Sequence, residues 1–140
     1  MTTMHLLFSH TLTEAQKADA ERSLGVRRFV PLPDHLQRLW SQIPPELESL
    51  DGHLSTVWDY LRREVSSGDV VLVQGDFGAT CRTVEVVRAL AAVPVYATTR
   101  RKAIEKTVEN KVVKTSVFEH VRFRKYMMKK NLEGETHENT

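Results

Sequence analysis

The chain has little of several residue types, and each shortage excludes a class of protein. One cysteine in 140 residues rules out an internal disulfide and a cysteine-rich zinc site. No apolar run approaches the roughly 20 residues that a membrane-spanning helix needs. The start of the chain, residues 1–5, lacks the charged and apolar regions of a signal peptide. We therefore expect a cytoplasmic protein with no membrane partner.

Metal-ligand patterns are also lacking. The acidic residues do not cluster, and no histidine stands at ligand spacing from an aspartate. We therefore expect a site without a metal, and we expect no other cofactor.

The net charge is small, but the basic residues are concentrated in one part of the chain. The formal net charge is only +2, yet residues 98–130 hold 11 basic and 3 acidic side chains, whereas residues 1–97 hold 9 basic and 12 acidic ones. A basic block beside a near-neutral body indicates an anionic partner. A solvated basic hairpin without a partner is the alternative.

The apolar pattern predicts an α/β fold. Residues 70–73 are four consecutive apolar residues, which is typical of a strand buried on both faces in a parallel sheet. A glycine turn at 75–78 and a helix over about 79–92 follow this strand. Further strands are predicted over 4–8, 26–32 and 93–99. A first helix is predicted near Thr13, with capping-box spacing at both Thr11 and Thr13 and a stop at Gly25. Further helices are predicted from Asp34 and over about 46–66, the latter continuous or broken at 51–52, and Leu47 and Leu50 would join its buried stripe.

We therefore predict one domain over residues 1–126 with a mostly parallel, Rossmann-like sheet flanked by helices. A C-terminal β-hairpin with a turn at 109–111 would complete it, and residues 127–140 would form a flexible tail. In the last strand, Val121 and Phe123 would share one face, and Arg122 and Arg124 the other. Two guanidinium groups on one face suit bidentate contacts to phosphate.

Three loops should meet where parallel strands end. They are residues 9–11, 74–80 and 98–101, and the carboxyl edge of such a sheet is where ligands bind. Their side chains and amides suit phosphate binding, and His10 could move a proton near neutral pH during metal-free phosphodiester cleavage. The candidate residues here are Ser9, His10, Thr11, Gln74, Gly75, Asp76, Phe77, Gly78, Ala79, Thr80, Thr98, Thr99 and Arg100.

Several of these residues allow more than one interpretation. Asp76 could be a base, a ribose ligand or a turn former. Phe77 could stack on a nucleobase, or it could pin the loop to the core. Trp40 is interpreted as a core-packing residue, and Cys81 as a small core or loop residue rather than a nucleophile.

Four segments together resemble a known family. They are Leu7–Thr13 (LFSHTLT), Gln74–Thr80 (QGDFGAT), Tyr96–Arg101 (YATTRR) and His120–Tyr126 (HVRFRKY). In this order they are similar to short standalone CRISPR-associated proteins of the Csx group, which accompany type III systems.

The resemblance implies a CARF-like fold and a homodimer that holds a cyclic oligoadenylate across its two-fold axis. It implies a ring nuclease that cuts this messenger, cyclic tetra-adenylate first of all, without a metal and so ends antiviral signalling. Ser9, His10 and Arg122 would then lie at the scissile phosphate. Residues 74–80 would hold phosphate and ribose, with Thr98, Thr99, Arg100 and Arg124 around the anion.

Two other functions remain open from the sequence. The chain could bind the ring without cutting it, or residues 98–130 could form a general RNA-binding module. DNA is not an expected partner.

Overall fold

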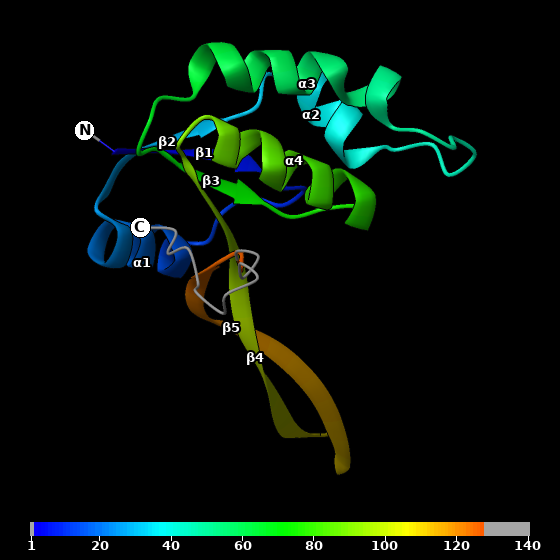
Figure 1. The fold of residues 1–140 in the computed structure, drawn as a ribbon. Coiled ribbons are helices and arrows are strands. Elements are labelled where there is room, and N and C mark those ends of the chain that lie inside the picture. Colours follow the sequence, from blue (N-terminus) through cyan, green and yellow to red (C-terminus); the bar gives the residue numbers. More distant parts are fainter. Residues whose placement is uncertain (1, 128–140) are drawn as a thin grey trace, which may run out of the picture.

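The structure is a computed structural model, and it describes residues 2–127 (Figure 1). The predicted tail at 128–140 lies outside the described residues. The elements in chain order are β1 (Thr2–Leu7), α1 (Glu14–Leu24), β2 (Val26–Pro31), α2 (Asp34–Ser41), α3 (Asp51–Glu64), β3 (Val70–Val73), α4 (Phe77–Ala89), β4 (Val93–Val108) and β5 (Lys111–Lys125).

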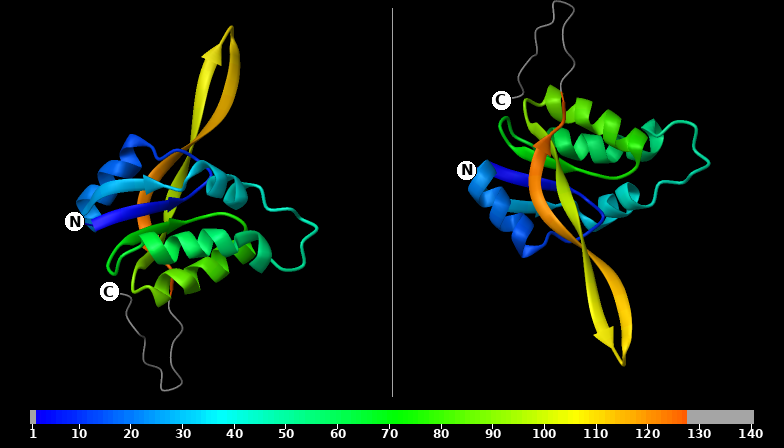
Figure 2. Two further views of the ribbon diagram at one scale, coloured as in Figure 1. Left: turned by 90° about the horizontal axis from the view of Figure 1, so that it is seen from above. Right: turned by 90° about the horizontal axis from the view of Figure 1, so that it is seen from below.

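The five strands form one curled sheet in the order β2-β1-β3-β4-β5 (Figures 1 and 2). β1 pairs in parallel with β2 and β3, and β3 pairs in parallel with β4. Only β5 runs antiparallel to its neighbour β4. The predicted α/β class, the mostly parallel sheet and the C-terminal hairpin are therefore confirmed.

Helices cover both faces of the sheet. Figure 1 shows α2, α3 and α4 together on one face and α1 on the other. Each face has its own apolar cluster, one built around Leu7, Val71 and Val73 and the other around Met4 and Leu72. All four residues of β3 are buried for this reason, as their unbroken apolar run predicts.

The ends of α1 follow from local sequence. The Thr13 hydroxyl accepts a hydrogen bond from the Gln16 amide at 3.1 Å, and the Gln16 side chain accepts one from the Thr13 amide at 2.9 Å. This capping box was one of two predicted start points. Gly25 ends the helix with a φ of 67°, a conformation that glycine adopts without strain. No helix in the described part of the chain is long and apolar enough to cross a membrane.

The predicted helix over 46–66 begins later than expected, at Asp51. Residues 46–50 lie outside any helix, so α3 starts at the position where the sequence also allowed a break, residues 51–52. The Leu47 side chain is 42% exposed, so its place in a buried stripe was wrong.

β4 does not end at Thr99, as predicted, but continues to Val108. Beyond the body of the sheet its backbone groups pair with β5 alone, from Thr99↔His120 to Val108↔Lys111. Thr98–Arg101 is therefore a strand and not an edge loop. The predicted turn is confirmed, because Glu109 and Asn110 have φ values of 52° and 64°, typical of a tight two-residue hairpin.

A β-bulge changes the faces of the last strand. Thr98 pairs with Arg122 but Thr99 pairs with His120, so Val121 is an extra residue. His120 and Phe123 therefore share a face, with ring centroids 4.8 Å apart, and Val121 and Phe123 do not. The predicted shared face of Arg122 and Arg124 is correct, because their partners Thr98 and Tyr96 are two residues apart.

Candidate functional site

The loops that follow β1 and β3 begin side by side at the carboxyl edge of the sheet. The Gln74 amide donates a hydrogen bond to the Leu7 carbonyl at 3.0 Å, just where both strands end. Residues 8–11 and 74–80 therefore meet at one edge, as the sequence predicted for these two loops.

Trp40 shapes the turn after β3. Its indole Nε1 donates to the Gln74 carbonyl at 3.0 Å, and its side chain is almost fully buried. A Cβ atom on Gly75 would lie 2.9 Å from the same Nε1, closer than atoms pack. Gly75 thus makes room for the Trp40 ring. The Gln74 side chain is also used, since its Oε1 accepts from the Ala97 amide at 2.8 Å.

The first turn of α4 is open to solvent. Asp76 caps it, because its carboxylate accepts from the Ala79 amide at 3.0 Å, which favours its interpretation as a turn former. The next residue, Phe77, is 93% exposed, so it does not pin the loop to the core. A Cβ on Gly78 would meet only ordinary contacts, the nearest at 3.5 Å. Backbone amides in a first turn have no acceptor within their helix.

Phe77 borders a hollow of about 300 Å³ that we call the tyrosine hollow. It is lined by Gln74, Gly75, Phe77, Thr80, Tyr96 and Tyr126. The two tyrosine rings lie 4.8 Å apart. The Tyr126 hydroxyl donates to the Val73 carbonyl, and burial together with the nearby Tyr96 raises the pKa of Tyr126 to about 12. Tyr126 therefore stays protonated and acts as a wall and a donor.

Sequence reasoning placed no site role on these two tyrosines. The available signal was their position, since each begins or ends a segment that carries the family resemblance. Their closeness depends on the pairing of β4 with β5, which no local pattern reveals.

Arginine reaches this side of the sheet from β5. The Arg124 guanidinium donates to the Tyr96 hydroxyl at 3.1 Å and lies 5.6 Å from the centre of the Tyr96 ring. Arg122 and Thr98 share this face, and the Thr98 hydroxyl donates to the Arg122 carbonyl at 2.9 Å. Arg100 also points to this side by strand alternation, and Thr99 to the other. Both lie on the exposed extension of β4.

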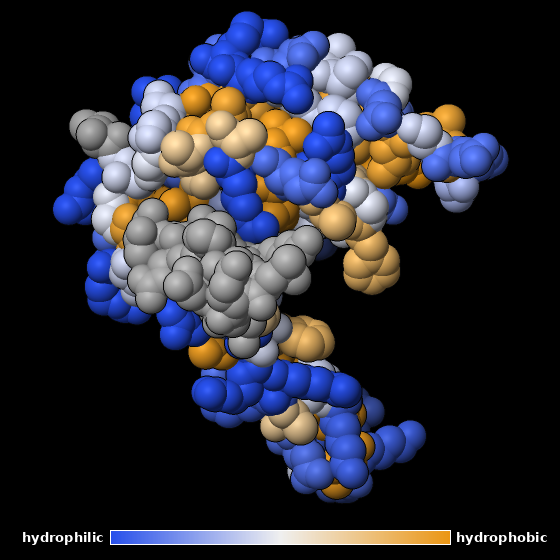
Figure 3. All heavy atoms as spheres, in the orientation of Figure 1, coloured by the Kyte–Doolittle hydropathy of each residue, from blue (hydrophilic) through white to orange (hydrophobic). Residues whose placement is uncertain are grey.

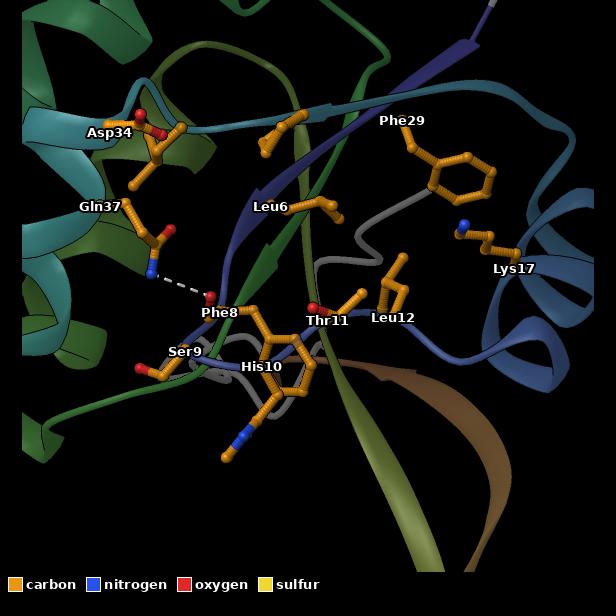
Figure 4. Close-up of a pocket in the computed structure, with 12 residues that line it drawn as sticks. Leu6, Phe8, Ser9, His10, Thr11, Leu12, Lys17, Phe29, Asp34 and Gln37 are labelled. Carbon is orange, nitrogen blue, oxygen red and sulfur yellow. Dashed lines mark hydrogen bonds between the residues drawn. The ribbon is translucent and has the colours of Figure 1, made fainter.

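A second, larger hollow of about 510 Å³ lies at the ends of β1 and β2, and we call it the histidine hollow (Figure 4). Ser9, His10 and Thr11 belong to its wall, with Lys17 approaching from α1 and Asp34 and Gln37 from α2. Its apolar wall consists of Leu6, Phe8, Leu12, Phe29, Pro31 and Leu32.

The Gln37 amide holds the end of β1, because it donates to the Phe8 carbonyl at 3.0 Å. The His10 ring lies edge-on to the Phe8 ring, with centroids 5.3 Å apart, and the Ser9 hydroxyl lies 3.3 Å from the Ser41 hydroxyl. Within residues 2–127, no hydrogen bond joins Ser9 to His10. Ser9 is therefore not set up as a histidine-activated nucleophile.

The single pocket expected from the sequence is therefore divided between the two hollows. Leu6, Phe8 and Phe29 of the histidine hollow pack in the cluster on the α1 face, whereas Tyr126 packs against the cluster on the opposite face. The two hollows share only the carboxyl edge. His10 and Arg122 do not come together within one chain. The sheet is curled, so residues on its two faces are separated even where they share the carboxyl edge, and the sequence pattern does not distinguish the two faces.

Two other histidines form buried pairs with aspartate. His5 lies 3.1 Å from Asp69 and His120 lies 2.8 Å from Asp19, all with little exposure. Burial favours a higher pKa for both carboxyl groups, but hydrogen bonds outweigh it and leave each pKa lowered. The donors are Ser23 and His120 for Asp19, and Ser66, His5 and Thr3 for Asp69.

His5 lies inside the sheet, so its pair with Asp69 fixes the start of β3 beside β1. The His120 pair fixes β5 on α1. Among the described residues, no group of three or more His, Cys, Asp or Glu is arranged to hold a metal ion. Cys81 is exposed on helix α4, so its interpretation as a core or loop residue was wrong.

Comparison with known proteins places the chain in a family. Residues 2–124 match the family described as "Uncharacterized protein MJ1673 family". The chain belongs to the MJ1673 family. It is 42% identical over 126 residues to the uncharacterized protein MJ1673 of Methanocaldococcus jannaschii, which covers 90% of this chain and 98% of that relative. The family match covers every residue that lines the histidine hollow, and it covers the tyrosine hollow except Tyr126. No solved structure matches the chain.

Proposed function

We propose that this member of the MJ1673 family is a metal-independent ring nuclease with a Rossmann-like, CARF-like fold, which binds a cyclic oligoadenylate, cyclic tetra-adenylate first of all, and cuts it to linear products. The protein then acts in the cytoplasm as a homodimer that ends type III CRISPR signalling. Four sequence segments in the order of the Csx group support the proposal, and all four lie at the carboxyl edge or at the base of the hairpin.

The observation that carries the proposal is the exposed Phe77 ring beside the tyrosine hollow. A large aromatic that is almost fully exposed at the first turn of a helix has no role in the core. Nucleobases stack on such rings, and the first-turn amides of α4 suit a phosphate oxygen. The Arg124 guanidinium, which lies over the Tyr96 ring, places a positive charge beside the tyrosine hollow.

The histidine hollow suits a second nucleotide of the same ligand. Its volume of about 510 Å³ and its Phe8 and Phe29 walls fit an adenine ring. Asp34 can accept from the adenine amino group, and Lys17 can contact a phosphate. A ligand with several adenosines can occupy both sides of the edge, which a mononucleotide cannot.

In the proposed reaction a ribose 2′-oxygen attacks the adjacent phosphorus. The new O2′–P bond forms as the P–O5′ bond breaks, so the products are a 2′,3′-cyclic phosphate and a 5′-hydroxyl. The 2′-hydroxyl proton leaves with a base, and O5′ gains a proton. In the proposed homodimer, Arg122 of one protomer stabilises the charge on phosphorus, and His10 of its partner carries a proton, with Ser9 beside it.

The test is an incubation of the full chain with cyclic tetra-adenylate in EDTA, with products resolved by chromatography and mass. Linear products that end in a cyclic phosphate support the proposal. Ring that is retained by the protein but stays intact would show a binder instead of an enzyme. Neither binding nor cleavage, with this and other ring sizes, would overturn the proposal.

Variants locate the site within this assay. Phe77→Ala should weaken ring binding about tenfold or more, because base stacking contributes about 1–3 kcal/mol per base. Phe118→Ala removes another exposed phenylalanine, on the far part of the hairpin, and should leave binding unchanged. If His10→Ala and Arg122→Ala both retain wild-type single-turnover cleavage, their assignment is wrong.

A further inference from the structure

The outer part of the β4–β5 hairpin, residues 99–120, is here called the arm. It projects away from the sheet and the helices in every view (Figures 1 and 2). Its side chains are exposed apart from partly buried Ile104 and His120. Five large apolar residues are among the exposed ones: Val108, Val112, Val113, Val117 and Phe118. Figure 3 shows apolar and polar atoms intermixed along it.

The exposed apolar residues of the arm indicate that another molecule packs against it. A two-stranded hairpin in water is marginally stable by itself, and exposed apolar side chains in a row are typical of an interaction surface. The composition of this hairpin, with five exposed apolar residues, favours a protein partner over solvent. Stacking aromatics, which single-stranded RNA would use, are reduced to Phe118.

The strand pairing sorts the arm into two different faces. Lys102 pairs with Val117, and Lys106 pairs with Val113, so these residues share one face. Ile104, Val108 and Lys111 lie on the same face by register. We call this the docking face. It combines four aliphatic residues with three lysines, of which Lys102 pairs with Glu119 at 3.5 Å while Lys106 and Lys111 lie nearer the tip. Phe118 and Val112 lie on the other face.

The body of the protein carries a surface with complementary chemistry. The segment 44–51 between α2 and α3, here called the acidic segment, reads PPELESLD and holds three acidic and no basic residues. Leu47 is exposed within it, flanked by Glu46 and Glu48. The acidic segment therefore presents an aliphatic side chain between carboxylates, and the docking face presents aliphatic side chains between lysines. The two surfaces are complementary in charge and both contain apolar area.

The arm and the acidic segment of one chain project in different directions (Figure 2), so they do not cover each other. We propose that the docking face of the arm binds the acidic segment of a second copy of this chain. In a dimer with a two-fold axis this contact occurs twice, because the arm of each chain binds the acidic segment of the other. The dimer is therefore closed.

This contact brings the partner's arm to the proposed active site. A Cβ atom on Gly78 would lie 3.7 Å from Leu50, so the acidic segment borders the first turn of α4. An arm that docks there adds the partner's lysines to the surroundings of Phe77. The inference rests on the homodimer of the proposed function. Its test measures self-association of the chain without any ligand. A failure of docking can therefore be distinguished from a failure of cleavage.

The test measures self-association of the full chain by sedimentation velocity over a concentration series. Two adjacent valines provide the first comparison, since both are exposed and neither packs in the core. Val113→Glu, on the docking face, should weaken association about tenfold or more, which corresponds to about 1.4 kcal/mol. Val112→Glu, on the other face, should leave association unchanged.

Charge reversal provides the second comparison. Lys106→Glu with Lys111→Glu, and separately Glu46→Lys with Glu48→Lys, should each weaken self-association. An equimolar mixture of the two double variants should associate again, because both arm–segment contacts of the mixed dimer then carry opposite charges. The control Glu14→Lys with Glu21→Lys reverses exposed charges on α1 and should have no effect.

Three results would overturn the inference. They are a wild-type chain that stays monomeric at all concentrations, a dimer that tolerates Val113→Glu as well as Val112→Glu, and double variants that do not associate when mixed. If the monomer instead binds linear RNA through Lys106 and Lys111, with steep salt dependence, the arm is a nucleic-acid surface.

Discussion

The inner and outer halves of β4 belong to one strand but to different environments. Val95 is fully buried between the two helical layers, whereas Val108, on the same strand, is 53% exposed. Inner β4 is held by β3 and β5 and by helices, while outer β4 is held by β5 alone. Stability therefore resides in the body, and the arm is available for contacts with other molecules.

The largest contrast should come from truncating apolar side chains in the two regions. Leu72→Ala removes a fully buried side chain at the centre of the sheet and should lower the free energy of unfolding by about 2–5 kcal/mol. Val112→Ala, at an exposed arm position, should change it by less than about 0.5 kcal/mol. Urea denaturation of both variants measures this. Equal losses would show that the arm is part of the folded core.

A smaller effect is expected at the edge where the body meets the candidate site. Gly75→Ala places a methyl group against the buried Trp40 ring and should destabilise by about 1–3 kcal/mol. Gly78→Ala, three residues on, meets only ordinary contacts and should be neutral or slightly stabilising within α4. Thermal unfolding followed by tryptophan fluorescence compares them. A tolerated Gly75→Ala would mean that Trp40 does not fix this turn.

The smallest effect concerns the base of the arm and depends on pH. The pKa of Asp19 lies below its ordinary value of 3.8 in the folded chain, despite burial, because Ser23 and His120 donate hydrogen bonds to it. Its contribution to stability is fully present above pH 3.8 and is lost as the pH falls through the lower folded pKa.

Asp19→Asn should therefore reduce stability at pH 6 and have progressively less effect below pH 3.8. Glu21→Gln, an exposed carboxylate on the same helix, is the control and should show no such dependence. Unfolding free energies over a pH series provide the measurement. A difference that persists unchanged at low pH would contradict the role of the Asp19 carboxylate.

Much of the fold could be predicted because its signals are local. The Thr13–Gln16 capping box, the stop at Gly25 and the buried run 70–73 each depend on neighbouring residues, and each was confirmed. The wrong predictions concern features that depend on contacts with residues distant in the sequence. The extension of β4 to Val108 depends on β5, and the exposure of Leu47 depends on which surfaces α2 and α3 leave uncovered.

The candidate site shows the same division. Local reasoning identified the Gln74–Thr80 turn, with Asp76 as a possible turn former, and it found the two arginines that share a face. It assigned Gly75 to a ligand, although Trp40, 35 positions earlier in the chain, requires that glycine. It also assigned His10 and this turn to one site, although in the folded sheet they line separate hollows.

The sequence by itself determined an α/β chain with a parallel central strand, helices with defined ends and a basic hairpin, because periodicity, caps and turn residues act over a few positions. Only the tertiary structure decided which residues line each hollow, where the two tyrosines meet and how far the arm projects. Those properties depend on strand pairing and sheet curvature, which bring together residues from distant parts of the chain, and no short-range pattern encodes them.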